Sequence, residues 1–122
     1  MRYLTLFVFA AIVFCPQAFA DDDPERGETT LKYLIYGGDI GDPVHATKKD
    51  AKVSFLVEGD LAKKIFESIG PDKKNVCTDG DGSRFRSKDN GKFFCLKDSD
   101  GTYGCYFGFD LKTGKSIFST TC

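Results

Sequence analysis

The segment "RFRSKDNGKFFCLKDSDGTYGCYFGFDLKTGKSIF" (84–118) decides the fold, because short β-strand patterns alternate there with turn dipeptides. The dipeptides are Asn90-Gly91, Asp100-Gly101 and Thr113-Gly114. Asn-Gly and Asp-Gly suit two-residue turns, whose central residues adopt a positive φ. The segment therefore predicts consecutive antiparallel hairpins, and each two-residue turn fixes which residues face each other.

The three turns predict mutually consistent registers. The facing pairs would be Phe85 with Leu96, Phe94 with Phe107, Leu96 with Cys105, Phe109 with Phe118, and Cys105 with Cys122. These pairs place one apolar set on a single face, namely Phe85, Phe94, Leu96, Cys105, Phe107, Phe109, Phe118 and Cys122. A slip of one residue in any hairpin would break the set, so we expect this face to be the core side of the sheet.

Four cysteines remain once a leader containing Cys15 is set aside: Cys77, Cys95, Cys105 and Cys122. An even count in an exported chain predicts two disulfides, with three connectivities open. The hairpin registers favour Cys105–Cys122, which leaves Cys77–Cys95. Zinc is disfavoured, because there is no Cys-x-x-Cys pair and His45 is the only histidine.

The same registers predict a basic and aromatic strip on the opposite face. Its members are Arg84, Arg86, Lys97 and Tyr106, and Tyr103 is expected close to Lys97 at the turn. Arg and Tyr often anchor protein interfaces, so this strip is the predicted partner-binding surface. The alternative interpretation is the ordinary solvated face of an antiparallel sheet.

The preceding part of the chain predicts two more strands and one helix. Residues 29–38 and 51–59 have strand patterns, and 39–50 reads as a loop rich in Gly, Asp and Pro. A helix would begin with Asp60 as its cap and end at Gly70-Pro71, with an apolar stripe of Leu61, Ile65, Phe66 and Ile69. The expected fold is α+β: an antiparallel sheet of about five or six strands, one packed helix and two disulfides in a single domain, 29–122.

The first twenty residues, "MRYLTLFVFAAIVFCPQAFA", predict a signal peptide cleaved after Ala20. They combine an early charge, a short apolar run and a small-x-small end. Residues 21–28 are acidic and predict a flexible lead-in. We therefore expect a periplasmic or secreted protein with no membrane span.

Little in the sequence points to catalysis or cofactors. A Gly-x-Ser-x-Gly elbow, a P-loop and a dinucleotide fingerprint are all missing from the sequence, and His45 lies in a loop pattern. The Asp-Gly runs at 79–82 and 98–101 fail the helix-loop-helix calcium template in every frame, so we expect turns and no metal. A net charge of −1 does not favour nucleic acid. The sequence predicts that the protein is not an enzyme.

Two stretches, "IFESIGPDKK…C" (65–77) and "CYFGFDLKTGKS" (105–116), carry a resemblance. The chain resembles small exported, mostly hypothetical proteins of Gram-negative bacteria, and in architecture is similar to periplasmic immunity proteins and lysozyme inhibitors. The resemblance implies a periplasmic binder that inhibits another protein, such as a secreted antibacterial effector. The alternatives are a module binding a cell-envelope glycan or small ligand, or a small hydrolase using an acid pair or His45. Free sheet edges also favour a homodimer.

Overall fold

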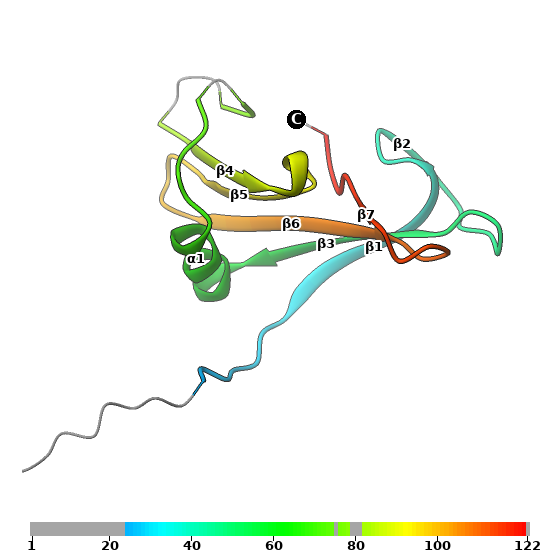
Figure 1. The fold of residues 1–122 in the computed structure, drawn as a ribbon, viewed down its shortest axis with the longest axis horizontal. Coiled ribbons are helices and arrows are strands. Elements are labelled where there is room, and N and C mark those ends of the chain that lie inside the picture. Colours follow the sequence, from blue (N-terminus) through cyan, green and yellow to red (C-terminus); the bar gives the residue numbers. More distant parts are fainter. Residues whose placement is uncertain (1–23, 75, 79–81, 122) are drawn as a thin grey trace, which may run out of the picture.

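A computed structural model describes residues 24–74, 76–78 and 82–121. The predicted signal peptide, Cys122 and part of the first Asp-Gly run lie outside the described residues. The chain folds into one helix on a seven-stranded antiparallel sheet, which confirms the α+β class (Figure 1). The elements, in chain order, are β1 (Leu31–Asp39), β2 (Asp42–Val44), β3 (Lys52–Glu58), α1 (Gly59–Ser68), β4 (Arg84–Lys88), the 3-10 turn η1 (Asp89–Gly91), β5 (Phe93–Lys97), β6 (Tyr103–Asp110) and β7 (Ser116–Ile117).

The sheet order is β2-β1-β3-β6-β5-β4, with β7 paired to β6. The sheet has more strands than the five or six expected, because a three-residue strand, β2, forms in the segment predicted as loop. Pro43 on β2 faces Gly38, a position where the missing N–H of proline costs no ladder hydrogen bond. The strand could not be predicted from the sequence, because it is only three residues long and contains a proline.

Helix α1 follows β3 directly and packs across one end of the sheet (Figure 1). Ala62 and Phe66 are buried four residues apart, so they share one face of the helix. Leu61 lies beside that face and is exposed. The predicted cap is wrong: Glu58 precedes the helix without a side-chain cap bond, and Asp60 lies in the first turn, where its charge suits the helix dipole.

The Asn90-Gly91 turn has the predicted register. Phe85 faces Leu96, and the amide of Lys92 bonds to the carbonyl of Asp89 at 3.0 Å. Asp89, Asn90 and Gly91 all have a positive φ, of 53°, 53° and 87°, so the turn extends beyond the two central residues while it keeps this register. This prediction is confirmed.

The Asp100-Gly101 turn is one residue longer than predicted. The amide of Asp98 bonds to the carbonyl of Thr102 at 2.8 Å, so three residues form the turn and Cys95 faces Cys105. Gly101 takes the left-handed position, with φ 88°. An Asp100 carboxylate oxygen accepts from the Thr102 amide at 2.9 Å and from its hydroxyl at 2.7 Å, which closes the longer turn. The predicted pairs of Leu96 with Cys105 and Phe94 with Phe107 are therefore wrong.

The third turn is longer still. Gly108 faces Ile117 and Phe109 faces Ser116, because the Asp110 amide bonds to the Lys115 carbonyl at 2.9 Å. The pairing of Phe109 with Phe118 is wrong by two residues. A shift of two keeps every side chain on its face, so this slip changes the partners without exchanging the faces.

The one-residue slip exchanges faces, and it decides the disulfide. Cys95 and Cys105 face each other and bond, with a Cα–Cα distance of 4.0 Å and both side chains fully buried. Both favoured pairings, Cys77–Cys95 and Cys105–Cys122, are therefore wrong. Cys77 is not a free thiol.

The sheet consequently has apolar residues on both faces. We call the side covered by α1 the helix face; its buried core is Val57, Ala62, Phe66, Cys95 and Cys105. The opposite side, the tail face, buries Tyr36, Phe85 and Phe94. The C-terminal segment crosses it, and the buried Ser54 hydroxyl donates to the carbonyl of Ser119. The predicted single inward set is therefore divided: Phe85, Phe94 and Leu96 face the tail, whereas Cys105, Phe107 and Phe109 lie on the helix face.

Candidate protein-binding surface

Three of the five predicted binding residues lie against the Phe66 ring, and a fourth, Lys97, lies against the ring of one of them. Arg84 and Arg86 lie on β4, Lys97 on β5 and Tyr103 on β6, and all four are on the helix face. Tyr103 meets Phe66 edge to face with ring centroids 5.4 Å apart, and the Lys97 ammonium lies 5.6 Å from the centre of the Tyr103 ring. The Phe66 cluster is our name for six residues: Phe66, Asp72, Arg84, Arg86, Lys97 and Tyr103.

Arg86 is built into the fold. Its side chain is only 16% exposed. Its guanidinium donates to the Phe66 carbonyl at 2.7 Å, which satisfies an acceptor in the last turn of α1, and stacks 4.2 Å from the Phe66 ring centre. Arg86 therefore has a structural role that sequence patterning did not indicate.

Asp72 holds both arginines. Its two carboxylate oxygens accept from Arg84 Nε at 2.7 Å and from Arg86 Nε at 2.6 Å. The hydrogen bond from Arg84, followed by that from Arg86, holds the pKa of the Asp72 carboxyl below its usual range. Arg84 remains 43% exposed, so it is the more accessible cation of the pair.

Tyr106 does not belong with the other four residues. It lies on the tail face, where its ring stacks on Phe94 with centroids 4.9 Å apart. Burial raises the pKa of the Tyr106 phenol. The structure thus divides the predicted strip, and the binding role of its residues stays a prediction.

A second surface was not predicted as a site. An aromatic row crosses the helix face next to α1: Tyr33 faces Phe55, and Phe55 faces Phe107 across three neighbouring strands. The Phe55 and Phe107 ring centroids are 5.1 Å apart, and Phe93 and Phe109 each meet the Phe107 ring edge to face.

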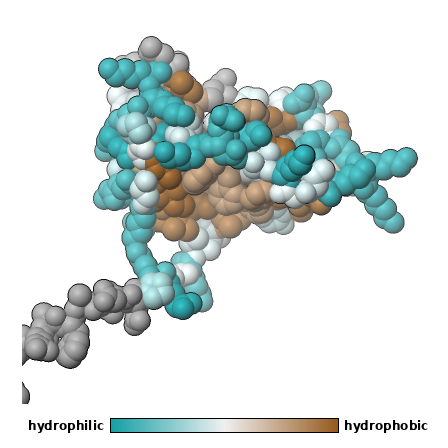
Figure 2. Space-filling view, in the orientation of Figure 1, coloured by the Kyte–Doolittle hydropathy of each residue, from teal (hydrophilic) through white to brown (hydrophobic). Residues whose placement is uncertain are grey.

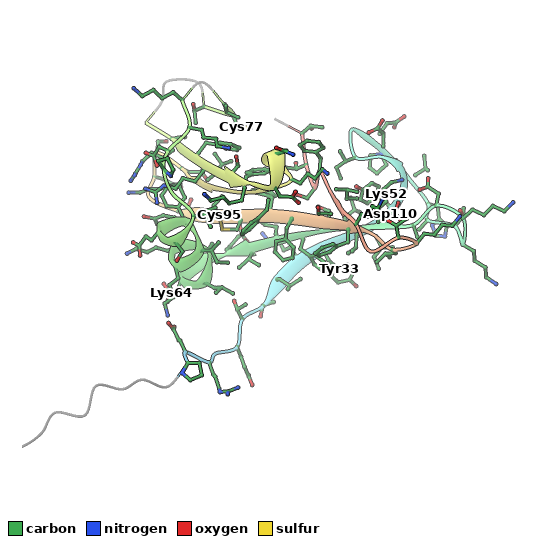
Figure 3. The ribbon with its side chains drawn as sticks, viewed as in Figure 1. Tyr33, Lys52, Lys64, Cys77, Cys95 and Asp110 are labelled. Carbon is green, nitrogen blue, oxygen red and sulfur yellow. A yellow bond between two sulfur atoms is a disulfide. The ribbon has the colours of Figure 1, made fainter. Side chains whose placement is uncertain are left out.

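This surface is open to solvent. Tyr33 is 69% exposed, Ile35 53% and Phe109 38%, whereas Phe55 and Phe107 are half-buried. Figure 2 shows hydrophobic residues gathered over the middle of the sheet, between α1 and the hydrophilic loops at the opposite end, and Figure 3 labels Tyr33. We call Tyr33, Ile35, Phe55, Phe107 and Phe109 the aromatic face.

The aromatic face exists because the helix is too short to cover the sheet. A helix of ten residues spans about 15 Å, whereas the eight residues of β6 span about 27 Å. Sequence reasoning placed Phe107 and Phe109 in the core. The length of the helical pattern was the signal that part of that apolar face would stay uncovered.

The described residues show no metal centre. In this part of the chain no group of three or more His, Cys, Asp or Glu side chains converges. His45 is exposed in the segment after β2. The Asp100 carboxylate accepts a hydrogen bond from the Thr102 hydroxyl. A hollow of about 760 Å³ lies between residues 25–29 and α1, and two of its lining residues, Glu25 and Lys64, form an ion pair. None of the helices among the described residues is long and apolar enough to span a membrane.

The fold and its surfaces define a small α+β protein with a disulfide-bonded sheet and an uncovered aromatic face. No protein-family model, curated protein or solved structure matches the chain. The resemblance to small exported bacterial proteins therefore stays a prediction.

Proposed function

We propose that this chain is an exported protein that binds and inhibits another protein, as an immunity protein neutralising a secreted antibacterial effector would. The observation that carries the proposal is the aromatic face. Contiguous exposed apolar surface of this kind marks interaction sites, because solvent exposure of large apolar side chains is unfavourable unless a partner covers them.

A protein partner suits this surface better than a glycan. Tyr33 contributes the only side-chain hydroxyl on the aromatic face, whose other members are Ile35 and three phenylalanines. Sugar recognition needs converging polar groups to bind the sugar hydroxyls, whereas the core of a protein interface is apolar and aromatic. The buried Cys95–Cys105 disulfide ties β6, which carries Phe107 and Phe109, to its neighbour β5, so little ordering is needed on binding.

The test compares binding before and after one change in the aromatic face. A protein retained from the native cell envelope by the immobilised chain is purified, and its dissociation constant is measured by calorimetry. Phe109→Ser should weaken binding at least tenfold, because loss of a well-packed interface aromatic costs about 2 kcal/mol or more. Leu111→Ser is the matched control, since Leu111 is 52% exposed but lies in the turn after β6.

Two outcomes would contradict the proposed surface. Equal affinities for the wild type and Phe109→Ser would exclude the aromatic face, and a loss only with Arg84→Ala would instead assign binding to the Phe66 cluster. For the small-ligand alternative, the candidate site would be the hollow beside α1. Titration of peptidoglycan fragments would then shift the NMR signals of Lys64 and Leu61 and leave those of Phe109 unchanged.

A further inference from the structure

The two edges of the sheet differ in a way that bears on self-association. At the β4 edge, the Lys73 amide bonds to the Phe85 carbonyl at 2.8 Å, so a crossing segment occupies that strand, and Arg84 and Lys88 add charge. At the other edge, β2 pairs only with Gly37, Gly38 and Asp39. Among the residues that the structure describes, 31–36 of β1 therefore have a neighbouring strand on one side only, β3.

The open part of β1 has only one of the usual protections of an edge strand, a single lysine. Leu31, Tyr33, Leu34 and Ile35 are all exposed large apolar side chains. Lys32 is the one charge, and its ammonium is paired with Glu58 of β3 at 2.9 Å. An edge with so many exposed apolar side chains is a template for another strand.

The direction of the backbone groups follows from Gly38. Its amide donates to Asp50 at 2.7 Å and its carbonyl accepts from Lys52 at 2.9 Å, so Gly38 faces the β3 side. Backbone groups alternate along an antiparallel ladder, so the even residues of β1 bond to β3. The N–H and C=O groups of Leu31, Tyr33 and Ile35 then face the open edge.

The geometry points to a two-fold dimer in which the open edges of β1 from two copies pair antiparallel, with Tyr33 facing Tyr33 of the second copy. This register sets Leu31 against Ile35 of the second copy and Lys32 against Leu34. The dimer then has three hydrogen-bonded pairs, one between the two Tyr33 residues and two between Leu31 and Ile35. Together these pairs form about six backbone hydrogen bonds. The result is one continuous sheet through both copies, with the two aromatic faces on the same side.

The neighbouring registers are worse. A centre at Lys32 places two ammonium groups opposite each other. A centre at Leu34 brings Leu31 against Gly37 of the second copy, where Val44 of β2 already pairs. A centre at Leu31 sets Ile35 against Gly27 and Leu34 against Glu28, which buries less apolar surface.

A second copy is the occupant that this edge fits. An isologous contact is self-complementary and uses the same edge on both chains, which closes the assembly at two. The β4 edge is bridged at Phe85 by Lys73 and carries two charged side chains, so it is less suited to pairing with a further copy. This pairing goes beyond the proposed function and does not depend on it.

The test is site-directed disulfide trapping combined with sedimentation of the oxidised protein. In the proposed register the two residue-33 Cα atoms lie about 5.5 Å apart, within disulfide range. Tyr33→Cys should therefore form a covalent dimer under mild oxidation. Leu34→Cys is the matched control, because its copies are diagonal neighbours at about 7–8 Å and should cross-link poorly.

Sedimentation of the wild type should show twice the chain mass at about 100 µM, in the range of ordinary protein association. Tyr33→Pro should raise the dimer dissociation constant at least tenfold, because it removes an outward N–H while the β1–β3 ladder stays intact. Unchanged circular dichroism verifies the fold. A monomeric wild type, or faster trapping at residue 34 than at residue 33, overturns the proposal. Partner binding in the assay above is a separate readout, so either proposal can fail alone.

Discussion

Arg86→Ala tests whether the guanidinium stacked on Phe66 is structural. The substitution removes a charged hydrogen bond to the Phe66 carbonyl, which is worth about 1.5–3 kcal/mol. It also removes a stacking contact at 4.2 Å worth about 0.5–1 kcal/mol. Asp72 keeps Arg84 as a partner, so its charge is not left unpaired. We expect the free energy of unfolding to fall by about 3 kcal/mol.

Arg84→Ala is the matched control. Arg84 bonds to the same carboxylate, but it is 43% exposed and lies 5.3 Å from the Phe66 ring centre. Exposed ion pairs contribute about 0–1 kcal/mol, so Arg84→Ala should cost about 1 kcal/mol.

Urea denaturation followed by circular dichroism measures both changes. With an m-value of about 1.5 kcal/mol/M, Arg86→Ala should lower the midpoint by about 2 M and Arg84→Ala by less than about 1 M. The reasoning is refuted if Arg86→Ala costs no more than Arg84→Ala. Such a result would mean that the guanidinium does not stabilise the end of α1, and it would leave Arg86 available for a binding role.

Three further predictions concern the sheet and its charges. The double substitution Cys95→Ala/Cys105→Ala should lower the free energy of unfolding by about 3 kcal/mol, because the disulfide closes a loop with a sequence separation of 10. Urea denaturation measures this change, and a loss under about 1 kcal/mol would contradict the prediction. The lowered pKa of Asp72 means that its contribution is present above the ordinary Asp pKa of about 3.9 and is lost as pH falls through the folded value. Urea midpoints from pH 6 to pH 2 should therefore fall more for the wild type than for Asp72→Asn, and parallel curves would refute the assignment. Gly108→Ala should lower the free energy of unfolding by about 1–3 kcal/mol, because the added Cβ would lie 2.7 Å from the Val53 carbonyl oxygen. Gly27→Ala is the control: a Cβ at that position meets no atom within 4 Å, so thermal unfolding should change little.

The class of fold follows from local signals that act over a few residues. The apolar stripe around Phe66 predicts the helix, and Asn90-Gly91 predicts its hairpin with the right register. The predicted register at Asp100-Gly101 is wrong because an Asp-Gly dipeptide suits both a two-residue turn and a three-residue turn with glycine in the left-handed position. The choice between them depends on Thr102, which bonds to the Asp100 carboxylate, and on the stability of the sheet that results.

The candidate surfaces were less predictable than the fold. The sequence grouped Arg84, Arg86 and Lys97 correctly, because the Asn90-Gly91 turn has the predicted register; Tyr103 shares their face only because the next turn is one residue longer than predicted. It could not show that α1 would pack beside them, since that requires knowing which face the helix covers. Once Phe66 is placed between these side chains, Arg86 becomes part of the core boundary.

The extra residue in the turn at Ser99-Asp100-Gly101 links the disulfide to the proposed binding surface. With a two-residue turn, Cys105 would face Leu96, and the side chains of β6 would exchange faces relative to β5. The three-residue turn instead sets Cys105 against Cys95 and brings Phe107 beside Phe93 on the helix face. Because Phe107 also faces Phe55, the turn that permits the disulfide also aligns the aromatic row across the sheet. The bond in turn opposes any slip of β6 against β5, so it holds the aromatic face in the register on which partner binding would depend.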